Sequence, residues 1–146
     1  MRTTFLAAAS YTLLGLISGL FYRELTRPRD FTGFTQLSVV HTHLLTLGTL
    51  VMLLLLVLQR SLQLNTGRLY WWGFGVYNFG LILTAGALWV GGTQTVLGTE
   101  PGAAHAGIAG LGHIGLTVGL LLLFIWIGKG VWALTAPAHA RTEVAS

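Results

Sequence analysis

Three histidines inside apolar stretches are the residues of this sequence best suited to chemistry. His41 and His43 stand at the head of one apolar stretch, and His113 lies among glycines in another. An ionisable side chain at membrane depth is costly and needs a partner. Because the chain has no cysteine, imidazoles from two different helices favour a bound metal ion or a haem iron.

The composition is typical of a membrane protein. The 146 residues have a mean hydropathy of +0.73, and only 8% of them are charged, whereas a soluble domain carries roughly 25%. Continuous apolar runs of about 20 residues can cross the hydrocarbon core as helices. The sequence therefore predicts an all-α polytopic membrane protein, a four-transmembrane-helix bundle forming one domain over 1–134, followed by a disordered cytoplasmic tail, 135–146. The predicted helices cover about 4–22, 37–62, 69–92 and 104–134.

The distribution of charge predicts the orientation in the membrane. With four spans, both termini and the loop between the second and third helices share one side, which holds most of the lysine and arginine residues. The positive-inside rule then places both termini in the cytoplasm, with the helices in the bacterial inner membrane. The net charge of +4 follows from this bias, so the expected partner is the lipid bilayer and no nucleic acid is implied.

The three histidines have a similar expected depth. His41 and His43 fall one to two turns inside the second helix, and His113 lies about two turns deeper than His105 in the fourth. Residues two apart on a helix diverge by about 200°, so His41 and His43 must face different neighbours. We expect His105 to lie near the aqueous edge, solvated or beside the site, and His139 in the tail to play no part.

Glycines near the histidines would suit a flat cofactor. Gly48 lies seven residues after His41, on the same face, and Gly112 adjoins His113. Glycine beside a buried histidine leaves a gap of the kind that a porphyrin plane needs. The simpler alternative is close helix packing, which the spacing Gly115-x-x-x-Gly119 favours.

Arginines on the expected outer side could bind the propionates of a haem. Arg23, Arg27 and Arg29 lie on the same side of the membrane as the histidines, and arginine binds carboxylates through two parallel hydrogen bonds. The alternative is that these arginines contact lipid headgroups or pair with Glu24 and Asp30.

The segment Phe-Thr-Gln-Leu-Ser-Val-Val-His-Thr, residues 34–42, resembles the second helix of the catalytic subunit of haem-copper oxidases, most closely the cbb3-type and nitric-oxide-reductase branch. This resemblance implies that His41 ligates a low-spin haem. The His41-x-His43 spacing is similar to another helix of those enzymes, whose two histidines face different haems, and to the haem- and copper-containing membrane proteins of the nitric-oxide response. Nothing matches the oxidase copper site, so the chain is not expected to reduce oxygen alone. Whether it is an oxidoreductase-like enzyme stays open.

As a whole, the chain is identified as a member of a small bacterial four-helix membrane family of unknown function, through residues 11–24, Leu37–His43 and 107–113. The oxidase subunit is built from three similar four-helix arcs. The resemblance to one arc suggests a homo-oligomer of three copies, in which His41 of one protomer and His43 of the next hold a haem. Pairing of His41 with His113 within one protomer is the competing arrangement.

The sequence therefore favours a b-type haem protein (heme b) whose iron is held by a pair drawn from His41, His43 and His113. Its expected role is electron transport with a redox partner, or binding of a small gas such as O2 or NO. Two alternatives remain. The same histidines could form a copper or zinc site across subunits, or they could be packing groups in a small non-catalytic membrane subunit.

Overall fold

The computed structural model describes residues 1–135 and is helical almost throughout this range. The expected all-α fold is confirmed, because four helical runs in the described range are long and apolar enough to cross a membrane. The predicted tail lies outside the described residues, except for Thr135. The elements are α1 (Arg2–Thr26), the 3-10 turn η1 (Arg27–Arg29), α2 (Leu37–His43), the π-helical η2 (Leu44–Leu50), α3 (Val51–Ser61), α4 (Arg68–Val96) and α5 (Ala103–Thr135).

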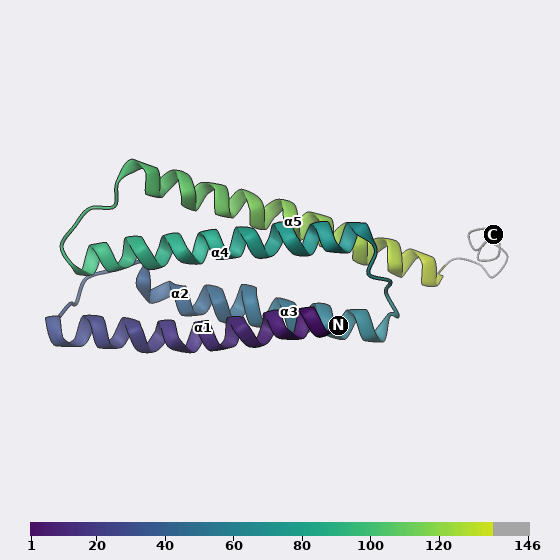
Figure 1. The fold of residues 1–146 in the computed structure, drawn as a ribbon, viewed down its shortest axis with the longest axis horizontal. Helices are drawn as coiled ribbons and strands as arrows, with labels where there is room; N and C mark the ends of the chain where they lie inside the picture. The colour runs from purple at the N-terminus through teal and green to yellow at the C-terminus, as the bar shows by residue number, and fades with distance from the viewer. Residues whose placement is uncertain (136–146) are drawn as a thin grey trace.

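Helix α4 lies between the other elements. Figure 1 shows α5 along one side of α4, with α1 and the continuous run α2–η2–α3 on the other, and the pattern of contacts between elements agrees. The connections 27–36 and 97–102 lie at one end of the molecule, called the outer end below. The N-terminus and the connection 62–67 lie at the opposite, inner end.

Glycines bring α4 and α5 together along a close seam. A Cβ atom at Gly115 would lie 3.0 Å from the Cα atom of Gly80, and one at Gly119 would collide with the backbone of Tyr77. Small residues let helices approach closely in lipid, where apolar side chains gain nothing by leaving the hydrocarbon. The packing alternative for Gly115-x-x-x-Gly119 is therefore confirmed.

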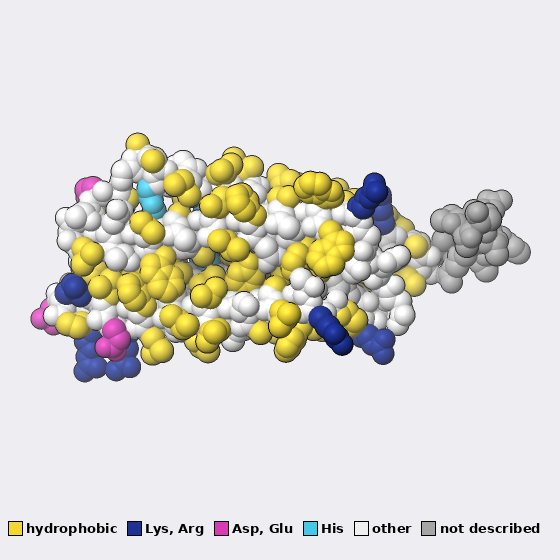
Figure 2. All heavy atoms as spheres, in the orientation of Figure 1, with side chains coloured by type: hydrophobic (Ala, Val, Ile, Leu, Met, Phe, Trp, Pro, Cys, Tyr) yellow, Lys and Arg dark blue, Asp and Glu magenta, His cyan; other side chains and the backbone are white. Residues whose placement is uncertain are grey.

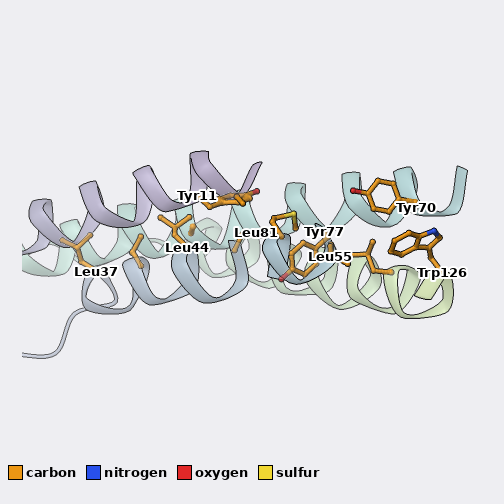
Figure 3. Close-up of a cluster of buried hydrophobic side chains, with 13 residues drawn as sticks. Tyr11, Leu37, Leu44, Leu55, Tyr70, Tyr77, Leu81 and Trp126 are labelled. Carbon is orange, nitrogen blue, oxygen red and sulfur yellow. The ribbon is translucent and has the colours of Figure 1, made fainter. Parts of the chain in front are cut away.

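The core combines aromatic and aliphatic side chains (Figure 3), and hydrogen bonds join its helices. The Thr4 and Tyr70 hydroxyls lie 2.7 Å apart near the inner end, and the Tyr11 hydroxyl donates to Asn78 Oδ1 at 2.7 Å. Each bond joins α1 to α4, and each satisfies polar groups that would otherwise be unpaired in hydrocarbon.

The second predicted helix is continuous but not uniformly α-helical. Residues Leu44–Leu50 form π-helical turns between α2 and α3. Within them, the carbonyl of Leu47 accepts a hydrogen bond of 2.9 Å from the Tyr77 hydroxyl, and Gly48 makes room for the ring of Tyr11. Side chains from α1 and α4 thus stabilise a backbone form that is usually confined to short insertions at functional sites.

The surface is divided as a bilayer requires. Figure 2 shows lysine and arginine side chains towards both ends of the visible face and aspartate and glutamate side chains at the outer end, with hydrophobic side chains between the ends. Large apolar residues are exposed along every span, as in α1 (Leu13, 60% exposed) and α5 (Ile114, 62%). An apolar surface of this extent fits contact with lipid acyl chains.

Candidate functional site

His43 is held with one ring nitrogen facing its own backbone. Its Nδ1 atom lies 3.0 Å from the carbonyl oxygen of Val39, one turn earlier in α2. Because a carbonyl oxygen can only accept, Nδ1 is the donor of this bond, and Nε2 is the ring nitrogen left for a ligand. Histidines that bind metals are commonly oriented in this way by a bond from the second nitrogen.

His113 has the same arrangement in α5. Its Nδ1 atom donates to the carbonyl oxygen of Ala109 at 2.8 Å, and the Thr117 hydroxyl donates to the carbonyl of His113 at 2.9 Å. The side chain of His113 is exposed on the surface of the chain. A second imidazole is therefore fixed in orientation, with its Nε2 lone pair directed away from its own helix.

The two imidazoles lie at nearly the same level. Leu37 in α2 packs on Gly92, and His105 in α5 packs on the preceding Gly91, so these contacts give both helices a common reference on α4. At 1.5 Å per residue, His43 is about 9 Å inward of Leu37, and His113 is about 12 Å inward of His105. Since Gly91 is itself about 1.5 Å inward of Gly92, the levels differ by about 4–5 Å, less than one helical turn.

A polar contact at the outer end shows which way His43 faces. Gln36 precedes His43 by seven residues, which places both on one face of α2. Gln36 Oε1 lies 3.5 Å from Nε2 of His105, in α5. The face of α2 that carries His43 therefore looks towards α5. Gln36 was not predicted from the sequence, although its spacing of seven residues from His43 was a usable signal.

His41 faces a different neighbour, as expected from its spacing. Its Cβ atom would lie 3.9 Å from a Cβ atom at Gly19 in α1, so the side chain is turned towards α1. Its Nδ1 atom is buried without a hydrogen-bond partner, and its Nε2 atom lies 3.4 Å from the Thr42 hydroxyl. His41 is thus turned towards α1 rather than towards α5, which carries His113, and the pair within one protomer stays a prediction.

The gaps expected beside Gly48 and Gly112 are filled by the protein itself. A Cβ atom at Gly48 would lie 2.5 Å from the ring of Tyr11, and one at Gly112 would lie 2.5 Å from the Thr84 hydroxyl. The idea that these two glycines make room for a porphyrin is thus corrected, because both serve close helix packing. The Thr84 hydroxyl is itself buried without a partner.

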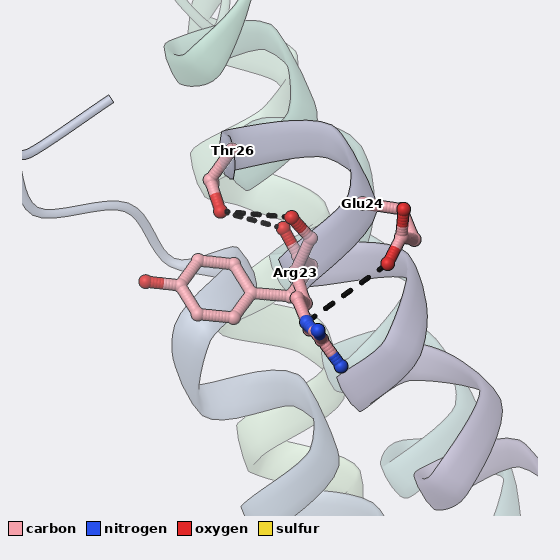
Figure 4. Close-up of polar contacts among 4 residues, drawn as sticks. Arg23, Glu24 and Thr26 are labelled. Atoms are coloured by element: carbon pink, nitrogen blue, oxygen red, sulfur yellow. Dashed lines mark hydrogen bonds and ion pairs between the residues drawn. The ribbon is translucent and has the colours of Figure 1, made fainter. Parts of the chain in front are cut away.

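The three arginines expected to bind propionates are exposed at the outer end. Figure 4 shows Arg23 beside Glu24, with Arg23 Nε 4.0 Å from Glu24 Oε1. Arg29 Nη1 donates to the carbonyl of Leu25 at 2.9 Å. An exposed ion pair contributes at most about 1 kcal/mol, so Arg23 can exchange Glu24 for another carboxylate at little cost.

The described part of the chain does not bring three metal-ligating side chains together. In residues 1–135, no group of three histidine, cysteine, aspartate or glutamate side chains is close enough to hold one metal ion. His41, His43 and His113 therefore do not form a shared ion site within one protomer. His139 lies outside the described residues.

Comparison with known proteins identifies the family. A family model described as "protein of unknown function (DUF2871)" matches residues 1–130. The chain belongs to this family. No curated protein and no solved structure matches the chain significantly. The likeness to haem-copper oxidases therefore rests on the motif around His41 alone, while the expected membership of a family of unknown function is confirmed.

Proposed function

We propose that this member of the DUF2871 family is a b-type haem-binding integral membrane protein that transfers electrons or binds a small gas such as O2 or NO. The observation that carries the proposal is the shared state of His43 and His113. Each donates Nδ1–H to the carbonyl four residues earlier. This bond leaves a basic Nε2 atom at membrane depth, where a lone pair without a partner is costly.

The residues present suit such a group. His43 and His113 would hold the iron through their Nε2 atoms, and the exposed arginines of the outer end would supply cations for the carboxylates of the haem. When bound, a haem supplies one-electron redox chemistry. The chain's own contribution is to orient the imidazoles through the carbonyls of Val39 and Ala109. With both axial positions taken, electron transfer is the favoured role, and a gas would have to displace one histidine.

The absorption spectrum of the purified protein tests the proposal. We expect membranes expressing the chain to yield a coloured protein with about one haem per protomer and, on reduction, the sharp visible bands of a six-coordinate low-spin b-type haem. The measurements are oxidised and reduced spectra and the ratio of haem to protein. A colourless protein that takes up no haem when haem is supplied would contradict the proposal.

Localisation in a bacterial inner membrane, with both termini in the cytoplasm, is part of the proposal, and the chain offers a clean test because it has no cysteine. We expect Thr99→Cys, in the connection after α4, to react with a membrane-impermeant maleimide in intact spheroplasts. Thr66→Cys, before α4, should react only after the membrane is opened. Labelling in the reverse order would show that the outer end faces the cytoplasm.

A copper or zinc site that His41, His43 and His113 form across subunits is the second candidate, favoured by the Nε2 atoms that the backbone bonds of His43 and His113 leave available. Metal analysis of haem-free protein decides between the two, since this candidate requires a stoichiometric metal that is lost on His41→Ala. A stable preparation without haem or metal would instead favour a non-catalytic membrane subunit.

A further inference from the structure

We propose that His43 and His113 of the same protomer form the axial pair, on the α2–α5 face. This face is defined here by His43 of α2 with Gln36, the N-cap residue of α2, and by Ala109 and His113 of α5. This inference rests on the proposed haem function and names the ligands. It differs from both pairings that the sequence suggested, since each of those used His41.

Contacts of two consecutive glycines place α2 relative to α5. Gly91 of α4 packs on His105 in α5, and Gly92 packs on Leu37 in α2. Consecutive residues of a helix are about 100° apart. Seen along α4, α2 therefore lies about a quarter turn from α5, in the direction in which α4 winds.

The same step places the His113 side chain. Gly112 of α5 packs on Thr84 of α4, and His113 is the next residue, about 100° further round. Because α5 runs antiparallel to α4, the two helices wind in opposite senses when viewed from one end. The step from Gly91 to Gly92 on α4 and the step from Gly112 to His113 on α5 therefore rotate towards the same side of the helix pair. His113 thus points to the side of α4 on which α2 lies.

His43 points to this side as well. It lies about 20° around α2 from Gln36, whose side chain contacts His105 of α5. His43 on α2 and His113 on α5 thus point to the same side of the molecule, and α4 lies between and beneath their two helices. His41, about 200° from His43, is on the opposite flank of α2, against α1.

The spacing of the helices suits an iron between the rings. Packed helix axes are about 8–10 Å apart. Two helices that both pack on α4 at about a right angle are then separated by roughly 11–14 Å. Helices in direct contact would bring the imidazoles against each other, whereas this separation leaves space for an iron with one Nε2 atom on each side.

Small residues next to His113 leave room for the rest of a macrocycle. Ala109 and Ala106, one and two turns outward, lie on the same flank of α5, and a Cβ atom at the neighbouring Gly110 would meet nothing within 4 Å. The bound group would thus extend along exposed small residues rather than into the tight seam at Gly112.

Single substitutions test the pair in the full-length protein. We expect His43→Ala and His113→Ala each to lower the ratio of haem to protein at least tenfold. Leu121→Ala, a control at an exposed residue of α5, should leave the ratio unchanged. His113→Met, which keeps a possible axial ligand, should retain haem with an altered low-spin spectrum. Added imidazole should restore the bis-imidazole spectrum in His113→Gly.

Retention of the wild-type spectrum in His113→Ala, or its loss in His41→Ala alone, overturns the pair.

A complementation experiment distinguishes a haem site within one protomer from a haem site between two protomers. Chains carrying His43→Ala and His113→Ala, with different affinity tags, are co-expressed and purified through both tags in succession. No chain then holds both histidines, so we expect the mixed oligomers to contain no haem. Recovered haem would show that the iron bridges two copies. A haem-free wild-type protein would count against the proposed function, whereas a haem-containing wild type with haem-containing His43→Ala and His113→Ala variants contradicts only the pair.

Discussion

Gly80→Leu is expected to separate α5 from α4 and to abolish the folded protein as it is normally isolated. Any Cβ atom at Gly80 would collide with the backbone nitrogen of Leu116 and would lie 2.6 Å from the carbonyl carbon of Gly115. Backbone atoms in two helices cannot move aside as a flexible side chain can. Overpacking of a tight site costs about 1–3 kcal/mol or more, and we expect a value at or above the upper end.

Gly86→Leu is the matched control on the same helix. Gly86 is exposed, and a Cβ atom there would meet nothing within 4 Å. Both changes give the same gain in helix propensity, so their difference isolates the contact with α5. The measurement is the yield and thermal midpoint of detergent-solubilised protein, followed by fluorescence-detected gel filtration. Equal behaviour of the two variants would show that the α4–α5 seam is not essential to the fold.

Tyr11→Ala is the second substitution with a large expected effect. The ring of Tyr11 fills the space over Gly48, and its hydroxyl joins α1 to Asn78 of α4 at 2.7 Å. The change leaves a cavity at the meeting point of three helices, and replacing a buried aromatic residue by alanine costs about 3–5 kcal/mol in protein cores. We expect a loss of about 3 kcal/mol, measured by unfolding in increasing concentrations of SDS.

Two further variants divide this effect into its causes. Tyr11→Phe keeps the ring and removes only the hydrogen bond, so a loss of about 1 kcal/mol is expected. Leu13→Ala, on the exposed face of α1, should change the unfolding midpoint little. If Tyr11→Phe were as destabilising as Tyr11→Ala, the hydrogen bond rather than the packing of the ring would hold the three helices together.

The sequence was sufficient to predict the four spans because each is a continuous apolar run bounded by polar or glycine-rich segments. The ends were less accurate, since α1 continues to Thr26 and α4 to Val96. The last turns lie beyond the apolar runs and carry polar residues, and the Thr26 hydroxyl donates to the carbonyl of Tyr22 at 2.8 Å. Such local bonds leave no trace in hydropathy.

The candidate site was predicted in part. The common level of the histidines follows from helix rise alone, and the divergence of His41 from His43 follows from helix rotation alone. The neighbour that each histidine faces could not be derived, because it depends on how a helix is rotated against its partners. That rotation is set by contacts such as Gln36 with His105 and Gly92 with Leu37. For the same reason, Gly48 and Gly112 were assigned to a cofactor although Tyr11 and Thr84 lie against them.

The π-helical turns Leu44–Leu50 join the outer half of the second span, which carries the histidines, to the inner half, which carries buried core residues. Turns of this kind arise where a helix carries one additional residue, which shifts the angular phase beyond it by about 100°. The outer half can therefore aim His43 at α5 while the inner half keeps Met52 and Leu55 buried in the core. Deleting one residue here would leave the span intact in length and hydropathy, yet it would turn either the imidazoles or the core side chains to the wrong side.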